Sequence, residues 1–212
     1  MLTSLLDSWQ MLPLFFVLGA TIGFVGAMVG IGGGLIAIPV LGLVFGMTQQ
    51  LAQGTALVMI IGNVLTAIYS YNKRSSIDFK KVALVVVMNM IATYFAALVA
   101  QLMDSNLLRD LFAVFLALVA TFYIWQTTGK KAKVVREERP LTRMAYIFLG
   151  LASGTIGGLF GVGCSLIVVP ILTVYFGVRQ TTAQGIALSM ILPGLIVALF
   201  TYSYGGNVDW WI

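Results

Sequence analysis

Long apolar segments alternate with short polar ones along most of the chain. A membrane-spanning helix needs about 20 mainly apolar residues, and segments of that length lie at residues 51–71, 82–100 and 107–125. Before them, residues 12–45 are apolar but interrupted by a cluster of glycines, and the piece after the cluster is too short to cross a bilayer alone. The pattern therefore predicts a hairpin over 12–45, whose second arm is a half-helix, followed by three complete spans.

Residues 127–143 are the most polar part of the chain and separate two apolar regions. They carry six Lys or Arg and two Glu side chains. Short cytoplasmic loops of membrane proteins are rich in Lys and Arg, so we expect a basic cytoplasmic linker rather than a nucleic-acid-binding tail. The linker would join a first unit, residues 1–126, to a second unit, residues 144–212.

The composition identifies the class of protein. The 212 residues are 60% hydrophobic and 9% charged, and the mean hydropathy is +1.02, whereas soluble domains carry about 25% charged residues. We therefore predict an all-α integral membrane protein whose main partner is the lipid bilayer. Histidine is absent and cysteine occurs once, so no His or Cys cluster is available for a metal or cofactor, and we expect neither.

The two apolar regions repeat one another. Shifting residues 19–79 by 131 positions onto 150–210 gives 22 identities in 61 positions without a gap. Chance similarity of two oily segments would match Leu, Val and Ala, whereas these segments also match glycine, proline, glutamine and aspartate in register. We infer an internal duplication. Counterparts of the spans at 82–100 and 107–125 would fall beyond Ile212, so the second repeat is expected to be truncated, in a fragment or a naturally shortened chain.

Loop charges indicate how the two repeats face. Basic residues at positions 73, 74, 80 and 81 have uncharged counterparts in the second copy, whereas Thr48 corresponds to Arg179. Basic loops mark the cytoplasmic side, so we expect the copies to insert in opposite orientations, as in inverted-repeat transporters. An inverted repeat requires residues 12–45 to cross out and back. The alternative is a single kinked span, which would make the repeats parallel.

The glycine cluster has two interpretations. Pairs such as Gly19/Gly23 let helices pack closely, which is the favoured reading for the pairs spaced by four. Three successive glycines break a helix, however, and the next half-helix then begins with free N–H groups at its positive end. That end suits an anion, with a purely structural bend as the alternative. The candidate substrate-binding residues at the two breaks are Gly32, Gly33, Gly34, Leu35, Gly163, Cys164, Ser165 and Leu166.

An Ala-Gln-Gly sequence follows each half-helix and adds Gln53 and Gln184 to the candidate site. A glutamine near the start of a span can either hydrogen-bond to the broken backbone or face the substrate, and both interpretations stand. Asn63 and Asn89 lie near mid-span, where amides commonly hydrogen-bond between helices.

Charged side chains are absent from the central part of every predicted span. Proton relays and buried cation sites in membranes usually employ such residues, so obligatory proton coupling through a membrane carboxylate is not expected. The chain also lacks a histidine base, a metal cluster and a carboxylate pair within the spans, which argues against an enzyme.

The duplicated Gly-x-x-x-Gly-x-Gly-Gly-Gly-x-x-x-x-Pro block, with Ala-Gln-Gly-Thr-Ala at 52–56 and Ala-Gln-Gly-Ile-Ala at 183–187, resembles the TauE/SafE family of sulfite and organosulfonate exporters. The resemblance covers about residues 14–212. It implies a multi-pass permease of the inner (plasma) membrane of a bacterium or archaeon that moves small sulfur-containing anions outward. Cys164-Ser165 departs from the Gly33-Gly34 of the first copy.

These observations favour an inverted-repeat transporter that exports a small anion, sulfite or a related oxyanion or sulfonate, by alternating access around the paired breaks. Backbone N–H groups, Gln53, Gln184 and Ser165 are expected to hold the anion. The rival interpretation is a passive anion channel or a non-transporting subunit of a larger complex. Homo-oligomerisation is left open.

Overall fold

The computed structural model describes residues 19–21, 23–24, 33–72, 79–128, 143–163 and 165–209. Within these ranges the chain forms helices and no strand, which confirms the all-α class. Five of the described helices are long and apolar enough to cross a membrane. They are α3 (Gln49–Asn72), α4 (Phe79–Leu102), α5 (Ser105–Thr128), α6 (Arg143–Phe160) and α8 (Gln180–Tyr204).

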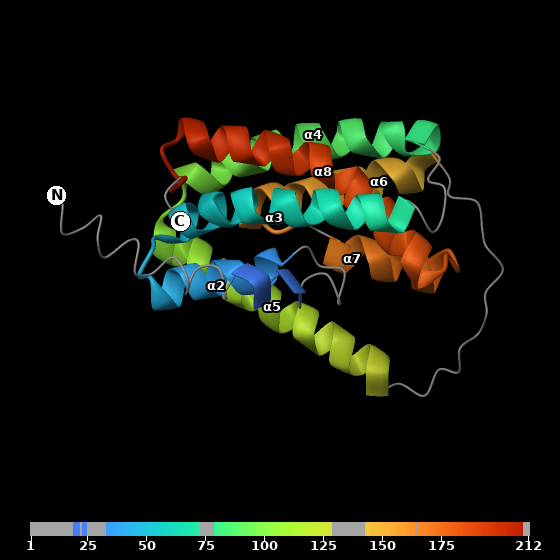
Figure 1. Ribbon diagram of the computed structural model, residues 1–212, viewed down its shortest axis with the longest axis horizontal. Coiled ribbons are helices and arrows are strands. Elements are labelled where there is room, and N and C mark those ends of the chain that lie inside the picture. The colour runs from blue at the N-terminus through green and yellow to red at the C-terminus, as the bar shows by residue number, and fades with distance from the viewer. Residues whose placement is uncertain are drawn as a thin grey trace.

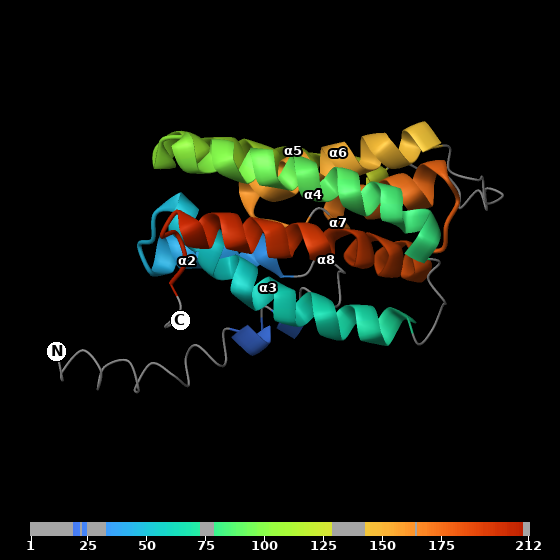
Figure 2. The same cartoon turned by 90° about the horizontal axis from the view of Figure 1, so that it is seen from above.

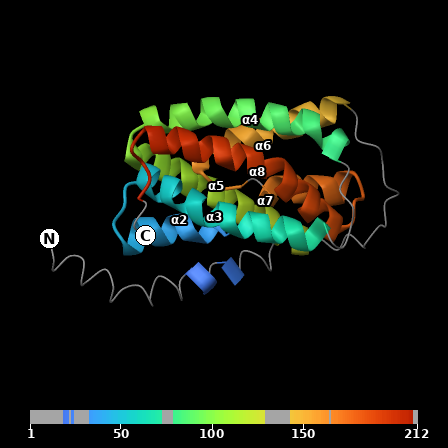
Figure 3. The same cartoon turned by 45° about the horizontal axis from the view of Figure 1, so that its top comes forward.

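Two shorter helices follow the glycine breaks. The first is α2 (Gly34–Val44). The second is α7 (Ser165–Pro170), which continues as a π-helical stretch, η1 (Ile171–Tyr175). Both half-helices begin near the middle of the bundle and extend toward opposite ends of it (Figures 1 and 3). Most of the predicted first arm of the hairpin lies outside the described residues, so whether 12–45 crosses twice stays a prediction.

Helix α8 is the centre of the bundle. It packs against α3, α4, α6 and α7, and Figure 2 shows it between α4 and α3. Its buried side chains include Leu188, Met190, Ile191 and Leu195. Helix α5 is the opposite case, since large apolar side chains such as Leu118 and Trp125 are exposed along it. Such a surface is expected of a helix that faces lipid.

Helices α4 and α6 run parallel and in register. Gly150, Gly154 and Gly158 recur every four residues and form one ridge on α6. A Cβ placed on Gly150 would lie 2.7 Å from the carbonyl oxygen of Val85, and Cβ atoms on the other two glycines would overlap the carbonyl oxygens of α4 one and two turns further on. The two backbones therefore touch directly, because only glycine leaves room for such an approach.

The segments α2–α3 and α7–α8 have the same local structure, as the sequence repeat requires. Each half-helix ends in a turn with a glycine of positive φ, Gly46 (φ 66) and Gly177 (φ 71). The same backbone hydrogen bond closes both turns, from Met47 N to Leu41 O (3.3 Å) and from Val178 N to Leu172 O (3.1 Å). Each acceptor and donor of the second turn lies 131 positions after its counterpart in the first.

Helices α3 and α8, which correspond in the repeat, pack antiparallel (Figure 1). Two hydrogen bonds fix this direction. Near the start of α3, Gln53 pairs with Tyr202 near the end of α8, and near the end of α3, Tyr71 pairs with Gln184 near the start of α8. The inverted repeat itself stays a prediction, since the antiparallel packing concerns this one pair of equivalent helices.

Candidate functional site

The second glycine break is built where α6 ends. Gly161 has a φ of 64°, a left-handed conformation that favours glycine, and its N–H closes the helix by donating to Gly157 O at 2.9 Å. Gly163 is packed beside Ile191 of α8, so that an added Cβ would lie 3.3 Å from a methyl group there. The N–H of Ser165 turns back to Gly163 O at 2.8 Å, and its hydroxyl also faces that oxygen at 3.4 Å.

Proline sets the shape of the half-helix that follows. Pro170 has no N–H and cannot donate to the carbonyl of Leu166 four residues earlier. That carbonyl instead accepts a hydrogen bond from the Tyr123 hydroxyl of α5, at 3.3 Å. A freed carbonyl in a membrane must find another donor, so α5 stabilises the broken helix from the side.

The first half-helix begins at a glycine in the left-handed conformation. Gly33 has a φ of 88° and caps α2 without any side-chain hydrogen bond. Its carbonyl accepts the first helical hydrogen bonds, from Ile36 N and Ala37 N at 3.2 and 3.1 Å. The N–H groups of the first turn therefore point out of the helix at its positive end, where an anion is stabilised.

The two breaks meet inside the bundle. A Cβ on Gly34 would overlap the side chain of Ile60 and would lie 3.7 Å from the carbonyl oxygen of Gly161. Gly33, Gly34, Gly161 and Gly163 are all buried. The start of α2 thus lies beside the backbone of the other repeat's break, in surroundings from which water is largely excluded.

Gln53 lies beside this junction. Its side chain is fully buried, and an added Cβ on Gly161 would lie 3.0 Å from the Gln53 Cβ. The Tyr202 hydroxyl donates to Gln53 Oε1 at 2.8 Å and also lies 3.1 Å from Gly158 O. Gln53 Nε2 is buried and has no hydrogen-bond partner among the described residues. A buried N–H group without a hydrogen-bond partner costs folding free energy. Such a group can donate a hydrogen bond to an oxyanion.

Gln184 is placed differently. Its Oε1 accepts a hydrogen bond from the Tyr71 hydroxyl at 2.9 Å. Tyr71 lies 18 residues after Gln53 on the same helix, a separation of roughly 27 Å at about 1.5 Å per residue. The two glutamines therefore sit near opposite ends of the α3–α8 interface, and one small anion cannot touch both at the same time.

The other candidates divide into three groups. Gly33, Gly34, Gly163 and Ser165 border the central junction. Leu35 and Leu166 lie in the first turn of α2 and α7, half-buried and buried respectively. Gly32 and Cys164 lie outside the described residues. In the described part of the chain, no group of acidic, His or Cys side chains is arranged to hold a metal ion.

Sequence analysis missed the two tyrosines that hold the glutamines. Their signal was present, because Tyr71 and Tyr202 are identical at the repeat offset. The pairing itself could not be read, since each tyrosine contacts the glutamine of the other repeat.

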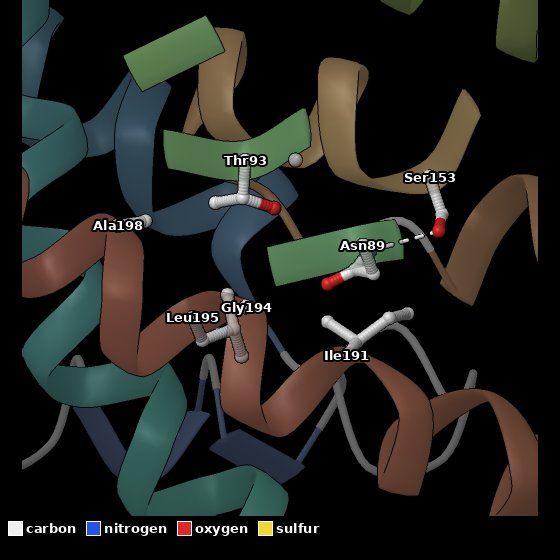
Figure 4. A pocket seen from close by; sticks show the side chains of 8 residues that line it. Asn89, Thr93, Ser153, Ile191, Gly194, Leu195 and Ala198 are labelled. Atoms are coloured by element: carbon white, nitrogen blue, oxygen red, sulfur yellow. Dashed lines mark hydrogen bonds between the residues drawn. The ribbon is translucent and has the colours of Figure 1, made fainter. Parts of the chain in front are cut away.

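A polar cluster between α4, α6 and α8 was only half anticipated. Asn89 Nδ2 donates to Ser153 Oγ at 2.8 Å, as expected for an interhelical amide, and Thr93 donates to Gly154 O at 3.2 Å. Figure 4 shows Asn89 and Thr93 above Gly194, where any Cβ would overlap Asn89 Oδ1. The cavity between them, about 10 Å³, is near the lower limit for one water molecule. It is too small for a substrate anion.

Comparison with known proteins places the chain in a functional context. The family model described as sulfite exporter TauE/SafE matches residues 15–212. A probable membrane transporter of Methanocaldococcus jannaschii is 29% identical, over 86% of this chain and 68% of its own length. A probable membrane transporter of Bacillus subtilis is 25% identical over 92% and 79%, and one of Xylella fastidiosa is 24% identical over 92% and 75%. No solved structure matches the chain.

Proposed function

We propose that this chain, which belongs to the sulfite exporter TauE/SafE family, carries a small anion out of the cell, sulfite or a related sulfur oxyanion or sulfonate. Its relatives are named probable membrane transporters and come from bacteria and archaea. The five long apolar helices make it a multi-pass membrane protein. The substrate class and the direction are proposed from the family description, and the mechanism is proposed from the site.

The meeting of the two helix breaks carries the proposal. An oxyanion bound there would accept hydrogen bonds from the first-turn N–H groups of Gly34 and Leu35, at the uncapped positive end of α2. Backbone donors need no positive side chain, and they act strongly where water is excluded. Gly32, Gly163, Cys164, Ser165 and Leu166 complete the proposed site from the sequence of the two breaks.

The glutamines have separate roles in this proposal. Gln53 is close enough to Gly161 to offer its unpaired Nε2 to an anion at the junction. Gln184, at the other end of the interface, would meet the anion at a different stage of its passage. Both remain substrate-binding residues in the proposal, although they act in sequence and not together.

Antiparallel packing of α3 and α8 supports an inverted repeat and therefore alternating access. A central site between two oppositely directed units can open to one side and then to the other. An anion leaving an inside-negative cell gains about 2.3 kcal/mol per charge per 100 mV, so export needs no ion-coupled carboxylate in the spans.

The test is flux from proteoliposomes loaded in turn with sulfite, thiosulfate, sulfate and short sulfonates. We expect saturable efflux of at least one of them, faster with an inside-negative potential. Ser165→Ala should lower the apparent affinity several-fold, because the anion loses one hydroxyl donor worth roughly 1 kcal/mol. Thr173→Val is the matched control, since that hydroxyl lies on the same half-helix but bonds only to its own backbone, at Val169 O and Pro170 O.

Unitary conductance together with flux that does not saturate would show that the protein is a channel and not a carrier. Equal affinity in Ser165→Ala and wild type, with flux intact, would remove Ser165 from the site. No flux of any of the four anions by correctly folded protein would overturn the proposed function.

A further inference from the structure

We propose that the two tyrosine–glutamine pairs are the two gates of the transport path. Tyr202 with Gln53, here called the outer pair, closes the path at one end of the α3–α8 interface. Tyr71 with Gln184, the inner pair, closes it at the other end. The proposal rests on the proposed function, because gates have meaning only for a protein that moves a solute.

The geometry of the two pairs is nearly the same. The hydroxyl-to-amide distances are 2.8 and 2.9 Å, and both partners of one pair correspond to those of the other at the offset of 131 residues. Each pair joins a residue of the first repeat to a residue of the second. Movement of α3 against α8 must therefore break at least one pair, and both are closed in this structure, as in an occluded transporter.

Neutral hydrogen bonds suit a gate that must open repeatedly. Neither pair contains a charge, so opening one does not strand an ion in the membrane. An opened pair presents a phenol O–H and an amide N–H, and both groups can donate hydrogen bonds to an oxyanion as it passes. The same side chains can then close behind it.

The two gates differ in how firmly they are held. Tyr202 is fully buried, and its hydroxyl also lies 3.1 Å from Gly158 O, on the α6 ridge that is packed against α4. Tyr71 is half-buried. The outer pair is thus tied to the most tightly packed helix pair of the bundle, whereas the inner pair lies nearer the surface, so the inner pair opens more readily.

The easier gate lies on the side expected for loading an exporter. Tyr71 directly precedes the basic loop at 72–81, which the sequence predicts to be cytoplasmic. A resting protein that opens more readily at the inner pair presents its site to the cytoplasm, where the anion to be exported is found.

The experiment measures access to the break from each side of the membrane. Cys164 is the single cysteine of the chain and lies between Gly163 and Ser165 in the sequence, so its labelling by a membrane-impermeant thiol reagent reports opening. We expect Tyr71→Phe to accelerate labelling from the cytoplasmic side in inside-out vesicles. We expect Tyr202→Phe to accelerate it from the opposite side in right-side-out vesicles. The expected factor is roughly three-fold, as for loss of one average interhelical hydrogen bond in a membrane.

The chain provides matched controls two residues away on the same helices. Tyr69 and Tyr204 are 74% and 92% exposed, so Tyr69→Phe and Tyr204→Phe should leave both labelling rates unchanged. If Tyr202→Phe fails to fold, Gln53→Met removes the same hydrogen bond from the other partner and should open the same side.

Acceleration from the same side by both variants would overturn the gate assignment, as would unchanged labelling in folded protein. These outcomes are distinct from failure of the proposed function. One such result is a wild-type protein that transports none of the test anions while Tyr71→Phe and Tyr202→Phe still accelerate labelling from opposite sides. That result would keep the gate assignment and overturn the proposed substrate class.

Discussion

The α4–α6 and α3–α8 interfaces both join the first repeat to the second, yet they are built from different contacts. Between α4 and α6 the backbones touch along a ridge of glycines. Between α3 and α8 the polar contacts are side chains placed at the two ends. Backbone contact in register leaves little freedom to slide or tilt, whereas side-chain hydrogen bonds can be exchanged by rotating a few bonds. One interface is therefore a scaffold, and the other is suited to movement.

Overpacking the scaffold should have the largest effect. In Gly154→Leu the new side chain collides with the Asn89 carbonyl, and even its Cβ would lie only 2.8 Å from the Ala92 Cβ. We expect a loss of at least about 3 kcal/mol, measured as a lower melting temperature in detergent. Gly62→Leu is the control, because nothing lies within 4 Å of a Cβ at Gly62. Equal loss in the two variants would contradict direct backbone contact between α4 and α6.

Adding one methyl group at the break should have a smaller effect. Gly161→Ala places a side chain at a φ of 64° and 3.0 Å from the Gln53 Cβ, so it combines backbone strain with a clash. Gly46→Ala has the same strain, at a φ of 66°, and open space around the new methyl. Strain alone costs about 1–2 kcal/mol. The additional loss in Gly161→Ala measures the contact with Gln53, and identical losses would show that the contact contributes nothing.

The polar cluster on the scaffold should contribute least. Asn89→Ala and Ser153→Ala both remove the hydrogen bond between α4 and α6, and their effects should not add. We expect a coupling free energy of about 0.6 kcal/mol from a double-mutant cycle, the average for such bonds in membranes. Thr155→Ala, whose hydroxyl bonds within α6 to Leu151 O, should show no coupling to Asn89→Ala. Full additivity of the first pair would mean that the bond is not made in detergent.

Helix class and position were accessible from the sequence because a bilayer imposes them. Apolar length predicted spans at 51–71, 82–100 and 107–125, and helices occupy Gln49–Asn72, Phe79–Leu102 and Ser105–Thr128. The faces of these helices were not accessible. Lipid is as apolar as a protein core, so the apolar side chains of a helix do not distinguish its lipid-facing side from its buried side. The glycines spaced by four predicted close helix packing on α6, but they did not indicate that α4 is the partner helix.

The site was predictable in kind but not in arrangement. Successive glycines before a proline indicated the half-helix starts, and the repeat indicated that there are two. The duplication also suggested that Gln53 and Gln184 bind the anion together, because equivalent residues of two repeats are expected to play the same role at one shared site. Antiparallel helices instead place equivalent residues at opposite ends, so each glutamine meets the tyrosine of the other copy. This cross-pairing follows from the antiparallel packing of α3 against α8. The sequence of one repeat alone does not encode that packing.

The parallel pairing of α4 with α6 also shows how the two repeats depend on each other. The helix with the glycine ridge belongs to the second repeat, and the helix that covers it belongs to the first. The two repeats are therefore interlocked at this interface, because each of them contributes one of the two helices whose backbones touch.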